Sequence, residues 1–437
     1  MISRDNIQKS SIRYYLLKKY VDFCFRVFYR VRYIHKEKTN TKEGSIFACN
    51  HQNALMDALA IHSSFTWQPV FLARADIFKN KTIARILQFL KILPVYRLRD
   101  GYDQLSNNQQ VFHQTFKVLK NRTPIAMFPE GNHLGIKKVR NLKKGLARIA
   151  FSFRHETLEK NELKIIPVGL NYENYHDPGS SLYIQFGEPL LISAYDNEYA
   201  ESPAKATNKF LQDLKKSLQQ NSIHIENEEL YPVADLVIKL YGINAKVKNI
   251  KAQDILQKQK ELISNLEKLY AKEPESYNNI RFHAEAFNKK LKHNKINPEY
   301  LKILFTENKT FKTLWQFVLI AGTSPFYIYS LINNIIPVYL IQKITRLIKD
   351  PQFKSSVFFV GSIFLIPIIH LLQAITVTAI INSWQCGLIY LLSLPISFWF
   401  KLKWERILRF YLTGIKARKI ITTIREHFLV IKEFYST

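Results

Sequence analysis

The sequence predicts an α/β fold, in which a mixed sheet flanked by helices precedes a charged helical region and C-terminal transmembrane helices. Between Gly44 and about Pro189, short apolar runs alternate with helical stretches, a pattern typical of an α/β domain with parallel pairing and crossovers. The longest uncharged stretches lie beyond residue 311. At 437 residues the chain exceeds the length of one ordinary domain. We therefore expect five segments, at 1–43, 44–200, 201–310, 311–402 and 403–437.

Strands and helices alternate along the predicted α/β region. Strands are expected at the short apolar runs Ser45–Cys49, Pro69–Ala73, Ile125–Phe128, Ile165–Leu170 and Leu182–Phe186. Helices are expected near Ala54–Ser64, Lys81–Leu90, Gln109–Lys120 and Gly145–Ser152. This alternation places loops at the carboxyl ends of strands, where α/β proteins bind ligands.

Residues 1–43 are predicted to form an amphipathic helix. Charged side chains interrupt the aromatic-rich stretch Ile12–Tyr33, so it lacks the continuous apolar core of a signal peptide. Such a helix either lies on a membrane interface or packs on the neighbouring domain, and the sequence leaves both open. Residues 201–310 are rich in Lys, Glu, Gln and Leu and are predicted to form charged helices without recognisable chemistry.

The longest uncharged stretch is predicted to cross a membrane as a hairpin of two helices. Between Lys354 and Lys401 lie 46 residues without Lys, Arg, Asp or Glu, whereas one helical crossing needs about 20 apolar residues. A break near Asn382, Ser383 and Gln385 falls where the hairpin must turn. Lys and Arg flank both ends, so both ends are expected to face the cytoplasm.

Two further segments near the C-terminus have alternative interpretations. The 30 uncharged residues between Lys312 and Lys343 contain Pro325 and Pro337, which favours a re-entrant or shallow interfacial helix pair over a single span. The stretch Lys403–Lys432 mixes large apolar residues with Arg and Lys. It suits a basic amphipathic helix on anionic lipid, and its alternative is a solvated charged face.

The composition narrows the class of partner. Lys plus Arg is 63 against 35 for Asp plus Glu, a net charge of +28, and 47% of residues are hydrophobic. This excludes a disordered basic tail and indicates a polyanionic partner. Because no helix-turn-helix, zinc-finger or aromatic RNA-binding pattern occurs, a phospholipid membrane and a phosphorylated small molecule are favoured over nucleic acid. Cys24, Cys49 and Cys386 form no metal-ligand pattern.

The first candidate for chemistry lies at residues 50–57, where a strand ends and a helix begins. A histidine acting as general base near neutral pH needs a carboxylate that fixes its tautomer. Asp57 follows His51 by six residues, and a short strand-to-helix loop can bring it back to the imidazole. The same spacing also arises by chance around a purely structural histidine.

Two further blocks carry groups suited to phosphate. Arg97 follows a Pro-led strand, and an arginine fork matches phosphate bidentately unless it belongs to a solvated turn. The apolar run ending at Phe128 leads into Pro-Glu-Gly, where Gly131 permits close backbone approach and Glu130 can accept from a hydroxyl or pair with Arg97. A basic cluster beginning at Lys137 follows. A fourth block, Ile-Pro-Val-Gly at 166–169, is predicted as buried strand.

Together and in this order, the four blocks resemble the glycerolipid acyltransferase family, which includes glycerol-3-phosphate and lysophosphatidic acid acyltransferases. The resemblance covers about residues 44–190. Five residues separate His51 from Asp57, where most of the family has four; this is similar to the fungal-type enzymes that acylate glycerol-3-phosphate or dihydroxyacetone phosphate. Asn132 and His133 replace the family's usual Thr/Ser-Arg, which moves the expected phosphate contact to Lys137 or Lys138.

The resemblance implies a membrane-bound acyltransferase whose catalytic domain lies on the cytoplasmic face. His51, oriented by Asp57, would take a proton from the acceptor hydroxyl as it attacks the thioester of acyl-CoA or acyl-carrier protein. The residues implied in substrate binding are Arg97, Glu130, Gly131, Asn132, Lys137 and Lys138. Neither a cofactor nor a metal is expected.

Two questions stay open at this point. The acceptor is either 1-acylglycerol-3-phosphate or glycerol-3-phosphate, and no residue of the sequence discriminates between them. A different class of function is a non-catalytic membrane-anchored protein that binds anionic phospholipid on an acyltransferase scaffold. The extra residue before Asp57 motivates that alternative, because it could prevent the carboxylate from reaching His51.

Overall fold

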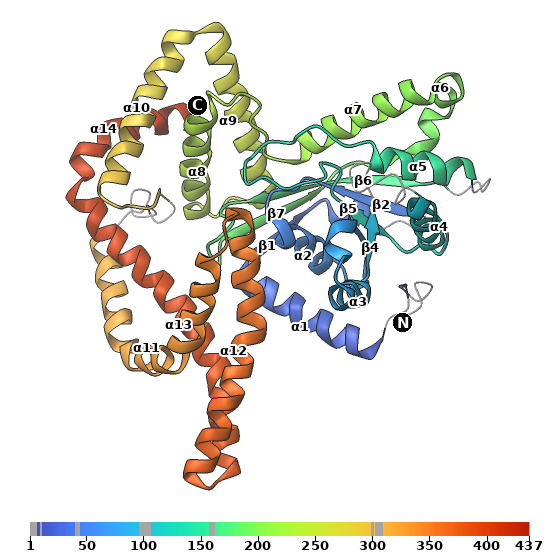
Figure 1. The fold of residues 1–437 in the computed structure, drawn as a ribbon. Helices are drawn as coiled ribbons and strands as arrows, with labels where there is room; N and C mark the ends of the chain where they lie inside the picture. The colour runs from blue at the N-terminus through green and yellow to red at the C-terminus, as the bar shows by residue number, and fades with distance from the viewer. Residues whose placement is uncertain are drawn as a thin grey trace. The chain divides into compact units, whose positions relative to one another are not determined.

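The structure is a computed structural model that describes residues 7–8, 11–39, 44–95, 106–156, 162–298, 301 and 309–436. The chain divides into two compact units (Figure 1). The sheet unit comprises Met1–His224 together with Asp350–Ser356. The helical unit comprises Ile225–Lys349 and Val357–Thr437.

The sheet unit is built on a mixed sheet, as predicted. The order of its strands is β1-β7-β6-β2-β5-β3-β4, with β8 beside β6, which makes eight strands in the described part of the chain. Their bounds are β1 Arg30–Ile34, β2 Ser45–Cys49, β3 Val70–Arg74, β4 Ile92–Val95, β5 Ile125–Met127, β6 Lys164–Tyr172, β7 Ser181–Phe186 and β8 Leu190–Leu191. The central strand β2 pairs in parallel with both β5 and β6.

The expectation of parallel pairing is wrong for two strands. β7 and β8 both run antiparallel to β6. The connection from Tyr172 to Ser181 is too short for a helical crossover, which needs a dozen or more residues, and it therefore makes a hairpin. This hairpin is what gives the sheet its mixed character.

The N-terminal helix is shorter than predicted. α1 ends at Phe28, and the next residues, Arg30–Ile34, form β1 in parallel register with β7. The exposed Arg30 and Arg32 alternate with the half-buried Val31 and Tyr33, a period of two that is typical of a strand and not of a continued helix. The start of α1 is capped by the Ser11 hydroxyl, which accepts from the Tyr14 backbone N–H at 3.2 Å.

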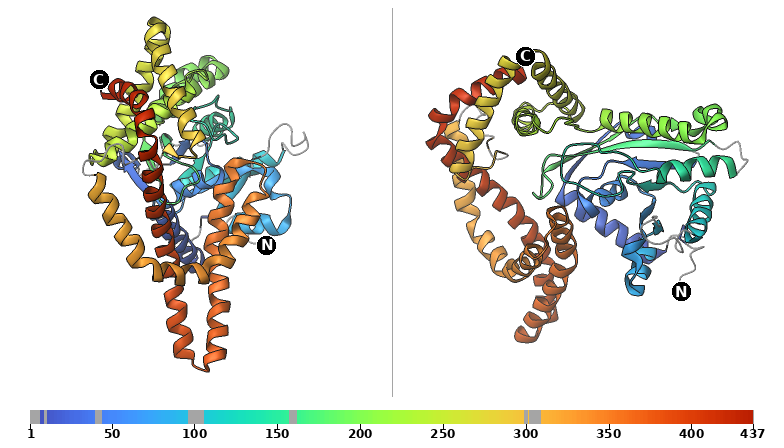
Figure 2. Two further views of the ribbon diagram at one scale, coloured as in Figure 1. Left: turned by 90° about the vertical axis from the view of Figure 1, so that its left-hand side faces the viewer. Right: turned by 45° about the horizontal axis from the view of Figure 1, so that its top comes forward.

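Helices cover both faces of the sheet. The helices of this unit are α1 Ile12–Phe28, α2 Ala54–Ser64, α3 Lys81–Phe89, α4 Ser106–Lys120, α5 Gly145–Glu156, α6 Asp196–Glu201 and α7 Pro203–Asn221. Ile46 and Ala48 of β2 point into a core that α5 and α7 complete. Phe47, on the opposite face, packs against Phe65 at the end of α2, with ring centroids 5.0 Å apart. Figure 2 (right) shows α5 and α7 on one side of the sheet and α1 and α2 on the other.

The helical unit contains the rest of the predicted charged helices and the apolar stretches. Its helices are α8 Tyr231–Val247, α9 Ala252–Lys272, α10 Pro274–His293, α11 Lys309–Arg346, most of α12 Pro351–Ile381, α13 Trp384–Lys419 and α14 Ile421–Ser436. The described residues between 201 and 298 are mostly helical, and they are shared between the units, since α7 packs on the sheet.

The helix pair predicted between Lys312 and Lys343 is wrong. One helix, α11, runs through this whole stretch and contains both Pro325 and Pro337. Proline normally interrupts a helix because it cannot donate to the carbonyl four residues earlier.

Side chains satisfy the two carbonyls that the prolines leave without a backbone donor. The Ala321 carbonyl accepts from the Ser324 hydroxyl at 2.7 Å. The Asn333 carbonyl accepts from the Gln373 amide at 3.0 Å. Because each freed acceptor has a partner, α11 continues past both prolines.

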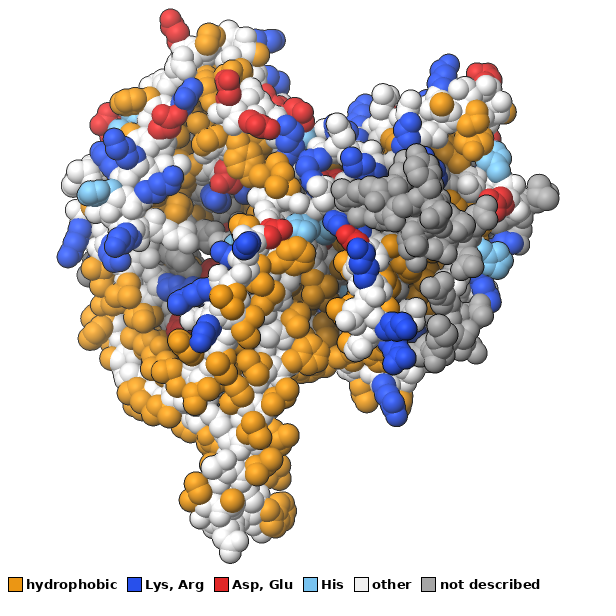
Figure 3. Space-filling view, in the orientation of Figure 1, with side chains coloured by type: hydrophobic (Ala, Val, Ile, Leu, Met, Phe, Trp, Pro, Cys, Tyr) orange, Lys and Arg blue, Asp and Glu red, His pale blue; other side chains and the backbone are white. Residues whose placement is uncertain are grey.

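The predicted apolar hairpin is confirmed as α12 and α13, with the break at Asn382 and Ser383. Asn382 has a φ of 54°, and the Ser383 hydroxyl caps α13. Within the described residues, α12 and α13 are the two helices long and apolar enough to cross a membrane. Figure 3 shows hydrophobic side chains over most of this hairpin. α13 continues across the boundary expected at 402, so the basic C-terminal stretch is divided between α13 and α14.

Candidate active site

The loop that carries His51 is fixed at its start by Asn50. β2 ends at Cys49, and the Asn50 side chain then pairs with the backbone of β6 as a strand residue would. Its amide donates to the Leu170 carbonyl at 3.1 Å and its oxygen accepts from the Leu170 N–H at 2.7 Å. The position of His51 is therefore set by the sheet, although Asn50 was not among the predicted site residues.

Asp57 reaches His51 despite the extra residue between them. Ala54, the first residue of α2, has a φ of 45°, which turns the chain sharply where the helix begins. Asp57 lies in the first turn of α2, and its Oδ2 is 2.8 Å from Nδ1 of His51. The same oxygen accepts from the backbone N–H groups of Gln52 and Asn53, both at 2.7 Å. These contacts hold the carboxylate in one position beside the first turn of α2.

The His51 ring is held by its neighbours but is not enclosed. It stacks on Phe128, with centroids 4.2 Å apart and planes at 17°. The edge of the His133 ring packs against it at 5.4 Å. The side chain is 14% exposed, whereas that of Asp57 is fully buried. Among the described residues, no group hydrogen-bonds to His51 Nε2, so its lone pair faces outward when Nδ1 carries the proton for Asp57.

Glu130 joins the His51 loop to the turn that follows β5. Its Oε1 accepts from the His51 backbone N–H at 3.2 Å, and its Oε2 lies 2.6 Å from Nε of Arg140. Burial raises the pKa of the Glu130 carboxyl, although Arg140 acts in the opposite direction. Gly131, with a φ of 77°, makes the turn that aims Glu130 back at His51.

Arg140 is the basic residue that the structure brings to this loop. Its guanidinium also donates to the Asn132 side-chain oxygen at 2.8 Å and to the His51 carbonyl at 3.4 Å. Arg140 belongs to the basic cluster that begins at Lys137, but the predicted phosphate contacts were Lys137, which is buried, and Lys138, which is half-buried. The ten-residue separation from Glu130 hid the pairing, because it depends on how the intervening loop folds. Arg97 lies outside the described residues.

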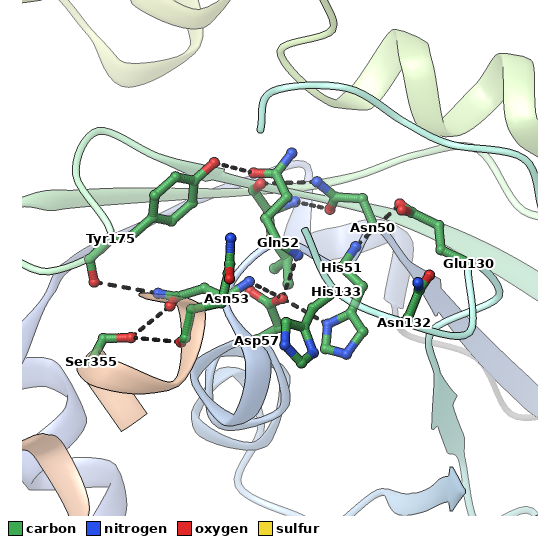
Figure 4. Close-up of polar contacts among 12 residues, drawn as sticks. Asn50, His51, Gln52, Asn53, Asp57, Glu130, Asn132, His133, Tyr175 and Ser355 are labelled. Atoms are coloured by element: carbon green, nitrogen blue, oxygen red, sulfur yellow. Dashed lines mark hydrogen bonds and ion pairs between the residues drawn. The ribbon is translucent and has the colours of Figure 1, made fainter. Parts of the chain in front are cut away.

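Two tyrosines support the loop, and Figure 4 shows one of them, Tyr175, beside Gln52. The Tyr175 hydroxyl donates to the Gln52 side chain at 3.0 Å. The Tyr29 hydroxyl donates to the Tyr175 carbonyl at 2.5 Å and accepts from the Asn53 amide at 3.1 Å. Consecutive residues of the loop are thus fixed by contacts from Tyr29, at the end of α1, and from the β6–β7 connection.

The arrangement suits proton abstraction from a bound hydroxyl. The carboxylate fixes the tautomer of a histidine whose second nitrogen is open, and a buried Glu–Arg pair lies beside it. In the described part of the chain, no three His, Cys, Asp or Glu side chains come together as a metal site.

Comparisons with known proteins match this part of the chain. A family model described as Acyltransferase matches residues 30–171. Glycerol-3-phosphate O-acyltransferase 1 of Saccharomyces cerevisiae is 29% identical over 136 residues, which cover 30% of this chain and 18% of the yeast protein. Glycerol-3-phosphate O-acyltransferase 2 of the same yeast is 25% identical over 120 residues, covering 27% and 16%. The chain thus spans less than a fifth of the length of these relatives.

A solved structure is also similar. It is the crystal structure of the 1-acyl-sn-glycerophosphate (LPA) acyltransferase PlsC from Thermotoga maritima, with 19% identity and a TM-score of 0.34. The similarity covers 47% of this chain and 78% of that structure.

Proposed function

The chain belongs to the glycerolipid acyltransferase family through its acyltransferase domain at residues 30–171, and from that premise we propose that it transfers a fatty acyl chain from a thioester to the hydroxyl of a glycerol phosphate. The observation that carries the proposal is the contact between His51 Nδ1 and Asp57 Oδ2 at 2.8 Å, with Nε2 left open. It also supports a catalytic role over a non-catalytic scaffold, because the extra residue does not separate the pair.

In the proposed mechanism, His51 Nε2 takes the proton of the acceptor hydroxyl as the oxygen attacks the thioester carbonyl. The tetrahedral intermediate collapses by breaking the carbon–sulfur bond, and the protonated His51 returns the proton to the leaving thiolate. Asp57 stabilises the imidazolium during this cycle. General base catalysis of this kind contributes about 10²–10⁴-fold.

The phosphate of the acceptor is proposed to bind on the side of the loop that holds Glu130 and Arg140. Arg140, whose guanidinium is held by Glu130 and Asn132 and is 20% exposed, supplies positive charge on this side of the loop. Arg97, Lys137 and Lys138 remain proposed contributors to the positive field. Since both yeast relatives are named as glycerol-3-phosphate acyltransferases, we propose glycerol-3-phosphate as the acceptor, with 1-acylglycerol-3-phosphate as the alternative.

The protein is proposed to act at a membrane, with α12 and α13 as two crossings and the sheet unit on the cytoplasmic face. The two helices meet the length and hydropathy of membrane spans, and Lys and Arg flank the hairpin at both ends.

A thioester-release assay tests the proposal directly. The purified full-length chain in lipid nanodiscs would be given acyl-CoA or acyl-carrier protein with glycerol-3-phosphate or 1-acylglycerol-3-phosphate, and the free thiol and lipid product would be measured. Product is expected with at least one acceptor, and its rate of formation should be about 10²–10⁴-fold lower with His51→Ala. Binding of anionic lipid with no thiol release under any combination would favour the non-catalytic alternative.

A further inference from the structure

The first turn of α12 belongs to the sheet unit and lies against the turn that follows Gly131. The Asp350 carboxylate is 3.1 Å from Nε2 of His133. Phe353 packs against the same ring, with centroids 4.8 Å apart and planes at 90°. The His133 ring in turn contacts the ring of His51. Residues 350–353 therefore reach the proposed base through one intervening side chain.

A second contact from the same turn reaches the loop between His51 and Asp57. The Ser355 hydroxyl donates to the Asn53 side-chain oxygen at 2.6 Å, and both side chains are buried. Asn53 is one of the two residues whose backbone N–H donates to Asp57. Figure 4 shows Ser355 beside Asn53, on the opposite side of the loop from Glu130.

A third contact joins the backbone at Gly135 to the Gln352 side chain. Gly135 lies so close to Gln352 that an added Cβ would be 2.9 Å from the end of the Gln352 side-chain amide. This approach holds the loop after Gly131 against the start of α12. Four residues between Asp350 and Ser355 thus contact two separate loops of the site.

We propose that this first turn, Asp350–Ser355, is a positioning element of the active site, in which Asp350 acts through His133 and Ser355 acts through Asn53. The proposal rests on the proposed function. Asp350 and Ser355 lie about 180 residues beyond the end of the domain matched at 30–171. The domain is therefore incomplete as a catalyst without the start of the helix that also begins the apolar hairpin.

Asp350 is proposed to act on His51 through the packing of the His133 ring against the His51 ring. Asp350 fixes one nitrogen of His133, and this limits rotation of the ring that packs on His51. Without it, His51 can leave its stacked position on Phe128 and its contact with Asp57 becomes less populated. Misplacement of a reacting group by about 1 Å can cost about 10²-fold in rate, so a partial loss of order should lower kcat about tenfold. KM for the thioester should change little, because neither residue is proposed to touch it.

Kinetics of full-length variants in nanodiscs test this proposal. Asp350→Ala and Ser355→Ala are each expected to lower kcat about tenfold, with Asp350→Asn intermediate because its oxygen can still accept from His133. Lys349→Ala, next to Asp350 and exposed, is the matched control and should keep the wild-type kcat. Thermal unfolding of every variant separates catalysis from folding, and Asp350→Asn decides if Asp350→Ala fails to fold.

A double-mutant cycle in kcat distinguishes a positioning role from a merely structural one. In a His133→Ala background, Asp350→Ala should cause no further loss of kcat, because Asp350 acts through that ring. Independent, additive losses would overturn the proposed path. Wild-type kcat in both Asp350→Ala and Ser355→Ala, with His51→Ala inactive, would overturn the positioning role and leave the proposed function intact. A wild-type chain without thiol release would overturn both.

Discussion

Helix α2 carries a His–Asp pair near each of its ends. At its start, His51 Nδ1 lies 2.8 Å from Oδ2 of Asp57. Toward its end, His62 Nδ1 lies 2.9 Å from Oδ1 of Asp22, a residue of α1. The histidine side chains are similarly exposed, at 14% and 12%. Distance and burial therefore do not tell which pair can act on a substrate.

The two pairs differ in what the remaining atoms contact. Nε2 of His62 lies 3.2 Å from the Tyr14 hydroxyl, and the second oxygen of Asp22 accepts from the Lys18 ammonium at 2.9 Å. Lys18 also donates to the His62 carbonyl at 2.7 Å. With both ring nitrogens occupied, His62 has no lone pair for a substrate proton, and the pair instead ties α1 to α2.

What distinguishes a histidine that can act as a general base is a ring nitrogen without a hydrogen-bond partner in the protein. His51 has one nitrogen fixed by Asp57, and its ring is stacked so that the other edge faces the surface. His62 has the same kind of carboxylate partner and cannot do the same work. Variants at matched positions of the two pairs turn this difference into measurements.

The largest difference is expected from replacing the histidines. His51→Ala should lower kcat by about 10²–10⁴-fold, since the proton acceptor is lost, with little change in thermal stability. His62→Ala should keep kcat but lower the free energy of unfolding by about 1–3 kcal/mol, because Asp22 and Tyr14 lose a buried partner. Steady-state kinetics and thermal unfolding of both variants measure these two effects. If His62→Ala lost activity and His51→Ala kept it, His62 and not His51 would be the general base.

The carboxylates give the next largest difference. Asp57→Asn should lower kcat about 10–10²-fold, less than the loss of His51 itself, because an amide stabilises the imidazolium poorly. Asp22→Asn should leave kcat near wild type and reduce stability, since the Lys18 ammonium is left buried without its carboxylate. The same kinetics and urea unfolding measure both effects. Equal kinetic losses in the two variants would show that the pairs are not distinct.

The sequence located one of these pairs and not the other for a physical reason. His51 and Asp57 are six residues apart across a single strand-to-helix turn, so local geometry was enough to suggest their contact. Asp22 and His62 are 40 residues apart, and only the packing of α1 on α2 joins them. Asp350 and Ser355 were hidden in the same way, by still longer separations.

The success of the predicted secondary structure also depends on whether an element is determined by local sequence or by distant contacts. β2 and α2 have the predicted bounds, because an apolar run and a helical pattern define them locally. β1 was predicted as helix. That prediction failed because pairing with β7, about 150 residues away, decides the conformation of this segment. α11 was predicted to break at its prolines. That prediction failed because the hydrophobic pattern does not reveal the side chains that replace the missing backbone donors.

A smaller effect concerns pH. Burial lowers the pKa of the His62 imidazole, although Asp22 acts to raise it. The unfolded chain therefore takes up a proton first as the pH falls below the ordinary value of 6.5, so stability should decline from pH 7 to pH 5. His62→Gln should flatten this dependence, as measured by urea unfolding at each pH. An unchanged slope would show that other groups control stability in this range.

The smallest effect is expected from Tyr14→Phe, which opens Nε2 of His62 and makes that pair resemble the His51 pair. The lost hydrogen bond should cost about 1 kcal/mol of stability, while kcat stays at the wild-type value. The sharper test is the double variant with His51→Ala. It should remain inactive, because His62 is not flanked by the buried Glu130–Arg140 pair that lies beside His51. Recovered thiol release would show that an open nitrogen on a His–Asp pair suffices by itself, and that the surroundings of His51 contribute nothing further.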